Sequence, residues 1–204
     1  MSGSETQSVY VVDDDPVVLD AIAELLQSVE LNTHTYASAQ QFFDAYNDDM
    51  SGCLLLDIRM PEMNGMELQK RLSDINAKLP IIFISGHADV SLAVRAMREG
   101  AFDLIEKPFR DNDLLECIYG ALKKDKEARA GQAGQAEIKE RLATLTNRER
   151  EIYDLVVAGK ANKVMAIELG VSQRTVEIHR ARVFKKMAVR SLAELVRMNT
   201  LLDS

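Results

Sequence analysis

The sequence contains few of the residues that cross-link small folds or bind soft metals. Only two of its 204 residues are cysteines, Cys53 and Cys117, and neither stands in a CxxC or Cys/His spacing. This argues against a zinc site or a disulfide framework. No apolar run approaches the roughly 18 residues that a membrane span needs, and the first residues lack the basic and apolar segments of a signal peptide. We therefore expect a cytoplasmic protein with free cysteines and no membrane partner.

Charge is distributed unevenly along the chain. Residues 1–122 carry 8 Lys and Arg against 21 Asp and Glu, a net charge of −13, whereas residues 123–204 carry 17 against 11, a net charge of +6. The length suits two modest domains. An acidic half followed by a basic half predicts a cationic partner for the first and a polyanion for the second.

The first half alternates short apolar runs with helical patterns. Strands are predicted at residues 9–12, 32–36, 53–56, 79–84 and 102–105. Helices are predicted at 16–29, from 39, at 66–75, at 90–98 and from 111. Strict alternation with right-handed crossovers predicts an α/β doubly wound, five-stranded parallel sheet with helices on both faces. Ligands bind such sheets beyond the carboxyl ends of the strands.

Polar side chains gather at the predicted carboxyl ends of four strands. Asp13 and Asp14 follow the first strand, Asp57 ends the third, Ser85 ends the fourth and Lys107 follows the fifth. Three carboxylates in one place repel each other, so a cation must accompany them if all are ionised. A site whose ligands are all oxygen atoms suits a hard ion, so Mg²⁺ is the expected cofactor.

This combination of groups predicts phosphoryl chemistry. A carboxylate beside Mg²⁺ and a lysine ammonium can attack a phosphoryl group, because both cations neutralise charge on the transferred oxygens. The Ser85 hydroxyl could then bind a phosphate oxygen, a contact that exists only while the phosphoryl is present. Asp15 is more simply explained as a cap for the next helix, and His87 as a loop residue without a role in the chemistry.

The second half is helical. Residues 123–141 lack an apolar stripe and are predicted to be a solvated helical linker. A capping box at Thr146 and Glu149 opens a helix, residues 162–169 form a short helix ending at Gly170, and Ser172 caps a longer basic helix to about Met187. A final helix follows Ser191. Residues 142–204 therefore predict a small all-α helix-turn-helix domain.

The motifs VVDDD, LLLDIRMPEMNG, FISGH and EKPF resemble those of response regulator receiver domains, over residues 9–121. The resemblance implies a receiver domain at 1–122, with Asp57 as the phosphoacceptor. It implies Mg²⁺ bound by Asp14 directly, by Asp13 through water, by Asp57 and by the backbone carbonyl of Arg59. Lys107 would contact the phosphoryl group, with a cis peptide bond to Pro108.

One position departs from that family pattern. The family often has an aromatic switch residue three positions before the lysine, where this chain has Leu104. Phe102 lies two residues earlier, and strand alternation predicts that it shares a face with Leu104. Either residue is a possible switch.

The segments LTNREREI, AGKANKVMA, VSQRTVEIHRARV and SLAELVRM resemble the LuxR-type helix-turn-helix, and the whole chain resembles the FixJ type of regulator. The resemblance implies that the recognition helix contacts DNA. Lys163, Arg174, Thr175 and Arg180 would contact mainly the DNA backbone, and Glu177, Ile178, Ala181 and Arg182 would face bases. Flanking basic residues such as Lys185 are expected at phosphates. His179 could instead pack against the turn.

Together these features predict a DNA-binding transcriptional regulator of a two-component system rather than an enzyme. Asp57 would receive its phosphoryl group from a sensor histidine kinase, and the phosphorylated chain would form a homodimer on promoter DNA, with RNA polymerase as a further partner. Two alternatives remain open. The receiver could drain phosphoryl groups from a kinase while the helical block docks a protein, or the block could bind RNA, although it lacks an aromatic stacking platform.

Overall fold

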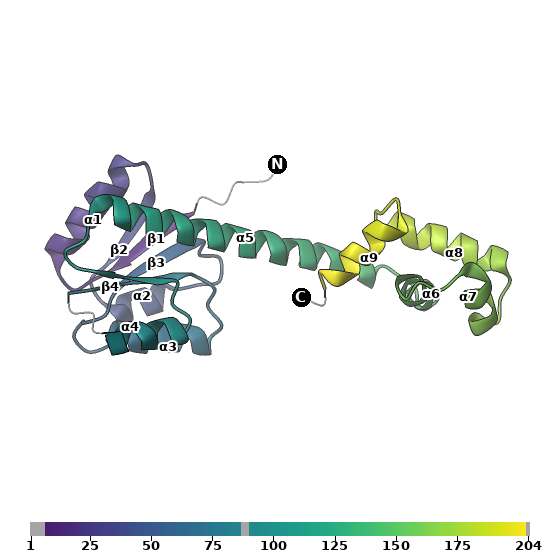
Figure 1. The fold of residues 1–204 in the computed structure, drawn as a ribbon, viewed down its shortest axis with the longest axis horizontal. Helices are drawn as coiled ribbons and strands as arrows, with labels where there is room; N and C mark the ends of the chain where they lie inside the picture. The colour runs from purple at the N-terminus through teal and green to yellow at the C-terminus, as the bar shows by residue number, and fades with distance from the viewer. Residues whose placement is uncertain (1–6, 87–89, 203–204) are drawn as a thin grey trace. The chain divides into compact units, whose positions relative to one another are not determined.

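The computed structural model describes residues 7–86 and 90–202, so His87 lies outside the described residues. The chain divides into two compact units, residues 1–128 and 129–204 (Figure 1). Within the described ranges, no helix is both long enough and apolar enough to cross a bilayer.

The first unit is built on a five-stranded parallel sheet, as predicted. Its strands are β1 (Ser8–Val12), β2 (Asn32–Tyr36), β3 (Gly52–Asp57), β4 (Ile81–Ser85) and β5 (Asp103–Glu106). They lie in the order β2-β1-β3-β4-β5. The chain first crosses from β1 to one side and then moves to the other side through β3, β4 and β5. The change of direction lies between β1 and β3, where ligand sites of doubly wound sheets form.

Helices cover both faces of this sheet, because the central strands are apolar on both sides and cannot face water. The helices are α1 (Pro16–Ser28), α2 (Ala39–Ala45), α3 (Gly65–Asp74), α4 (Val90–Arg98) and α5 (Asp111–Ala143). In Figure 1, α1 and α5 lie over one face, and α2, α3 and α4 lie over the other. Each face has its own apolar core, one around Leu26, Leu55 and Ile118 and one around Phe42, Leu56 and Phe83.

The prediction that Phe102 and Leu104 share a face is wrong. Phe102 packs into the core beneath α1 and α5, whereas Leu104 packs into the core on the opposite face. Phe102 lies just before β5, where its N–H donates to the carbonyl of Ile81 (2.7 Å), so strand alternation does not extend to it. Its ring lies over Gly120 of α5, where an added Cβ would be 3.2 Å from the ring. The Lys124 ammonium is 5.3 Å from the ring centre.

Helix α5 runs without a break through the segment predicted as a solvated linker, and one residue of that segment is deeply buried. Asp125 is 1% exposed. Its carboxylate accepts hydrogen bonds from Gly52 N–H (2.9 Å), Ser51 Oγ (3.0 Å) and Gln7 Nε2 (3.0 Å). The amide of Gln7 also donates to the carbonyl of Leu122 (2.8 Å). This network ties α5 to the amino-terminal edge of the sheet.

The second unit is all helical, as predicted. It contains α6 (Asn147–Val157), α7 (Asn162–Leu169), α8 (Gln173–Lys186) and α9 (Leu192–Thr200), together with the end of α5. Gly170 ends α7 in the left-handed conformation (φ 65°), which favours glycine. Ile152, Tyr153, Val176 and Val183 lie at the centre of the core. The turn between α7 and α8 therefore sets α8 on the surface with one face buried.

Candidate functional site

An acidic pocket lies at the carboxyl ends of β1 and β3, at the switch point of the sheet. Asp13 directly follows β1, and Asp57 is the last residue of β3. Val12 pairs with Leu56 across the two strands, which places the two carboxylates side by side. Asp13 is 2% exposed and Asp57 is 7% exposed. Two buried carboxylates at neighbouring strand ends need a cation between or beside them if both are ionised.

Lys107 supplies one such cation. Its Nζ lies 2.7 Å from Asp13 Oδ2 and 2.7 Å from Asp57 Oδ1. The backbone N–H of Lys107 donates to the carbonyl of Ser85 (2.8 Å) at the end of β4, and the peptide bond from Lys107 to Pro108 is cis. Ser85 itself is 1% exposed. The structure thus brings together four of the residues expected at the strand ends.

The loop after β3 is folded tightly under Asp57. The N–H of Arg59 donates to Asp57 Oδ2 (2.6 Å), and the N–H of Gly65 donates to the carbonyl of Ile58 (3.0 Å). An added Cβ on Gly65 would lie 2.3 Å from the backbone oxygen of Asp57. Only glycine permits this approach, which returns the chain to the start of α3 and fixes the loop after Asp57.

The pocket carries more negative than positive charge. Burial raises the pKa of Asp57 and the neighbouring Asp13 raises it further, against the opposing effect of Lys107. Burial lowers the pKa of Lys107, but hydrogen bonds and attraction to Asp13 and Asp57 outweigh it and raise that pKa overall. The repulsion of Asp57 by Asp13 and the attraction that raises the pKa of Lys107 both indicate that the pocket favours additional positive charge.

The donor set of the pocket fits Mg²⁺. Asp14 is exposed next to Asp13 and lines an open cleft of about 960 Å³ together with Arg59 and Asn64. The available donors are carboxylate and carbonyl oxygens, which this ion prefers. Among the residues that the structure describes, no three His, Cys, Asp or Glu side chains already form a cluster able to hold a metal. A bound ion would therefore complete its shell with the Arg59 carbonyl and water. Asp15 caps α1 by accepting from Val17 N–H (2.9 Å).

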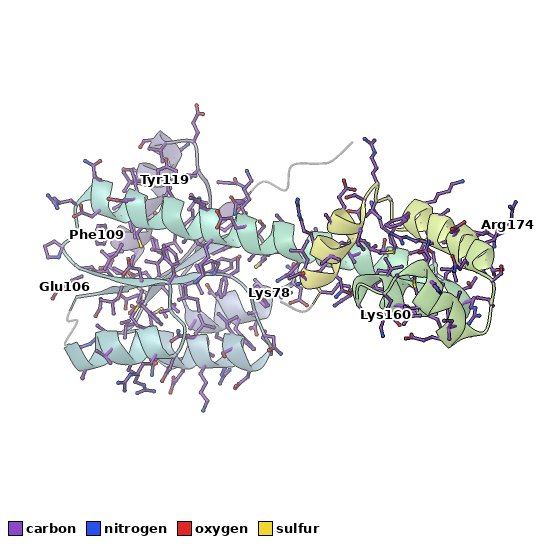
Figure 2. The ribbon with its side chains drawn as sticks, turned by 45° about the vertical axis from the view of Figure 1, so that its right-hand side comes forward. Lys78, Glu106, Phe109, Tyr119, Lys160 and Arg174 are labelled. Atoms are coloured by element: carbon purple, nitrogen blue, oxygen red, sulfur yellow. The ribbon has the colours of Figure 1, made fainter. Side chains whose placement is uncertain are left out.

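A second candidate surface lies on α8. Its core-facing residues Val176 and Val183 are buried. A stripe of exposed side chains runs along the opposite face at helical spacing: Arg174, Glu177, Ile178, Ala181, Arg182 and Lys185. Figure 2 shows Arg174 at the amino-terminal end of α8, pointing away from the rest of its unit. Thr175 is half-buried at the same end, with its Oγ1 2.8 Å from Ser172 Oγ. Lys163 is exposed on α7.

Two basic residues of α8 are held within the unit. Arg180 Nη1 donates to Asn162 Oδ1 (2.8 Å), and its guanidinium lies 5.4 Å from the centre of the Phe184 ring. Lys186 Nζ donates to Glu149 Oε2 (2.6 Å) and to the carbonyl of Thr144 (2.8 Å). His179 is half-buried, and its Nδ1 has no hydrogen-bond partner among the described residues.

Sequence reasoning did not identify Asn162 and Asp125 as contributing residues. Asn162 opens α7 and fixes Arg180; no periodicity marks it, because its partner lies in another helix. Asp125 stands in a charged, apparently solvated run. The sequence offers one signal for its burial. Asp125 comes seven residues, or two helical turns, after Ile118 and so shares the buried face of α5.

Comparisons with known proteins assign a family to each half of the chain. Residues 9–119 match the response regulator receiver domain family, and residues 143–199 match the LuxR family of bacterial regulatory proteins. The response regulator TodT of Pseudomonas putida is 41% identical over 190 residues, covering 93% of this chain and 84% of TodT. The transcriptional regulatory protein FixJ of Azorhizobium caulinodans is 42% identical over 194 residues, covering 95% and 92%.

Among solved structures, that of the response regulator StyR superposes with a TM-score of 0.87 at 38% identity, covering 96% of this chain and 98% of StyR. The two family matches and the relatives span nearly the whole chain and join a receiver to a LuxR-type helix-turn-helix. The chain belongs to the FixJ-like response regulators, the transcriptional regulators of two-component systems.

Proposed function

We propose that this regulator accepts a phosphoryl group on Asp57 from a sensor histidine kinase, with Mg²⁺ as cofactor, and that phosphorylation promotes dimerisation and promoter binding. The observation that carries this proposal is the Lys107 ammonium, 2.7 Å from both buried carboxylates at the switch point of the sheet. Asp57 is the better acceptor of the two, because it is the more exposed, at 7% against 2% for Asp13.

In the proposed reaction a carboxylate oxygen of Asp57 attacks phosphorus. An O–P bond forms, the N–P bond to the donor imidazole breaks, and the imidazole leaves with the electron pair of that bond. Mg²⁺, when bound by Asp13, Asp14, Asp57 and the Arg59 carbonyl, supplies charge neutralisation on the transferred oxygens. Lys107, whose Nζ lies 2.7 Å from Asp57 Oδ1, would contribute charge neutralisation of the same kind. Slow attack of water on the aspartyl phosphate returns inorganic phosphate, and we expect no other catalysis.

The switch would begin at Ser85 and Lys107. Their side chains gain a phosphoryl oxygen to contact, so the phosphorylated state favours a position of β4, β5 and α4 that closes on it. Leu104 fills the family's aromatic switch position with an aliphatic side chain, and Phe102 faces α5 instead. Val94 and Met97 of α4 are 44% and 46% exposed. Apolar residues left open on this helix support α4 and β5 as the dimer surface.

The helix-turn-helix would place α8 in the major groove. Lys163, Arg174, Thr175, Arg180 and Lys185 would contact mainly the DNA backbone, and Glu177, Ile178, Ala181 and Arg182 would face bases. A homodimer would present two such helices to a two-fold related site. The protein would act in the cytoplasm and present its bound dimer to RNA polymerase.

A mobility-shift assay tests this proposal. Full-length protein is titrated on genomic DNA fragments with and without a small acyl phosphate donor and Mg²⁺. We expect the donor to raise the affinity of the wild type and to leave Asp57→Asn unchanged, while Asp49→Asn, a surface control on the same unit, responds like the wild type. Equal affinity of wild type and Asp57→Asn at every protein concentration, with the wild type fully phosphorylated, would refute the switch.

A further inference from the structure

Ile178 is an apolar side chain on α8 that the protein leaves uncovered. It is 46% exposed, whereas Val176 and Val183 of the same helix are buried, and it belongs to no part of the apolar core of this unit. Burying an isoleucine side chain is worth about 1.5–3 kcal/mol. Because Ile178 stays 46% exposed, folding realises only part of this free energy. The exposed part of the side chain is available to an external apolar group.

The neighbours of Ile178 indicate what kind of surface covers it. Glu177 and Ala181 adjoin it in the exposed stripe. Arg174, Arg182 and Lys185 surround them, and within the described part of the chain none of these three cations has a hydrogen-bond or ion-pair partner for its side chain. Arg174 and Lys185 are free cations at the two ends of an acidic and apolar centre, which fits duplex DNA, in which the phosphates flank a groove of base edges. Arg182 adjoins Ala181 and would face bases with the centre, as proposed above.

The centre of the stripe cannot lie against phosphate. The carboxylate of Glu177 would be repelled there, and it has no hydrogen-bond or ion-pair partner among the residues that the structure describes. Cytosine offers its N4 amino group as a donor in the major groove, and thymine offers its 5-methyl group, the apolar feature of that groove. Ala181 is small enough to let the helix approach closely.

The helix is also held firmly enough to read base edges. Arg180 is fixed by Asn162 of α7, and Lys186 is fixed by the buried Glu149 of α6. Arg180 lies between Ile178 and Ala181 in the sequence of α8, and Lys186 directly follows Lys185 at the end of the exposed stripe. These two ties hold the orientation of the helix about its axis, which decides the groups that Glu177 and Ile178 face.

We propose that Ile178 packs against the 5-methyl group of a thymine and that Glu177 accepts a hydrogen bond from the N4 amino group of a cytosine in the same half-site. These two residues then determine the sequence specificity of the regulator. The proposal rests on the DNA-binding role assigned to α8 above, but not on the phosphorylation switch.

A thymine-to-uracil scan tests the role of Ile178. A duplex is selected from random-sequence DNA with full-length wild-type protein, and each thymine is replaced singly by deoxyuridine, which removes only the methyl group. We expect one position in each half-site to lose about fourfold in affinity, the effect of burying one methyl group. In Ile178→Ala that position becomes insensitive to uracil, while Ile75→Ala, an equally exposed isoleucine of the first unit (47%), keeps the wild-type pattern.

A base-pair scan on the same duplex tests Glu177. The wild type should lose about tenfold in affinity when the recognised C·G pair becomes T·A, and Glu177→Ala should lose this preference while still binding DNA. Specific binding with the same uracil and base-pair patterns in wild type, Ile178→Ala and Glu177→Ala overturns this inference and leaves the proposed function standing. If the two variants lose these base preferences but phosphorylation does not change the affinity of the wild type, the switch is overturned and the inference on Ile178 and Glu177 is supported.

Discussion

The ion pair between Glu149 and Lys186 joins the first turn of α6 to the carboxyl-terminal end of α8 and should stabilise the second unit. Glu149 is 3% exposed and lies in the first turn of α6, where it forms a capping box with Thr146. Its carboxylate accepts hydrogen bonds from Lys186 Nζ (2.6 Å) and from the N–H of Thr146 (2.9 Å). These two contacts, with the Lys186 bond the larger effect, lower the pKa of Glu149 from 4.5 to about 2. Neutralising Glu149 should therefore loosen the carboxyl-terminal end of α8.

The magnitude follows from the pKa. The difference between the unfolded and folded pKa of Glu149 corresponds to at most about 3 kcal/mol of folding free energy at neutral pH. The Lys186 side chain is 35% exposed, so solvent screens the pair, and we expect about 1–2 kcal/mol. Because the folded pKa is lowered, the stabilisation is complete above pH 4.5 and is lost as the pH falls toward 2.

Hydrogen exchange measures the stabilisation of α6 and α8 locally. The full-length protein is followed by mass spectrometry, with a correction for intrinsic exchange rates at each pH. Peptides of α6 and α8 should lose about 1–2 kcal/mol of protection in Glu149→Gln at pH 6, and the difference from wild type should shrink by pH 3. Glu151→Gln removes an exposed carboxylate of the same helix and should change little. Equal protection of wild type and Glu149→Gln at pH 6 would refute the reasoning.

Three further outcomes follow from single contacts. Asp125→Ala should lower the free energy of unfolding of the first unit by about 2–4 kcal/mol in urea denaturation, because buried donors lose their acceptor; a loss no larger than that of the exposed Asp113→Ala would contradict the burial argument. Gly65→Ala should cost about 1–3 kcal/mol and slow phosphorylation of Asp57, because its Cβ would displace the loop; unchanged phosphorylation kinetics would show that the loop adapts. Asn162→Ala should weaken DNA binding without changing the slope of log affinity against log salt concentration, whereas Arg180→Ala should reduce that slope by about one. The same slope in wild type and Arg180→Ala would show that Arg180 does not contact phosphate.

Sequence patterns were sufficient for the order and type of the elements and for the convergence of Asp13, Asp57, Ser85 and Lys107. Both depend on strand alternation, helix caps and the topology of parallel sheets, which are local or follow from connectivity. The cap at Asp15 was predictable for the same reason. The face of Phe102 was not, because alternation holds only within a strand and Phe102 precedes β5 by one residue.

Contacts between distant segments could not be predicted in this way. Lys186 lies in the basic run at the end of α8 and its side chain is 35% exposed, but its ammonium is held by Glu149 and the carbonyl of Thr144. Asp125 appeared solvated because its neighbours in the sequence are charged. Its partners, Ser51 and Gly52, lie 74 and 73 residues away. Such pairs depend on how elements pack, which composition and periodicity do not encode.

The central claim is that the pocket at the strand ends holds a divalent ion and a phosphoryl group on Asp57. The most direct measurement is mass spectrometry of the protein after incubation with an acyl phosphate donor, with peptide mapping of the modified residue. We predict one phosphoryl group per chain, located on Asp57, formed with Mg²⁺ and absent after chelation. Modification at another residue, or equal labelling without a divalent ion, would contradict the account.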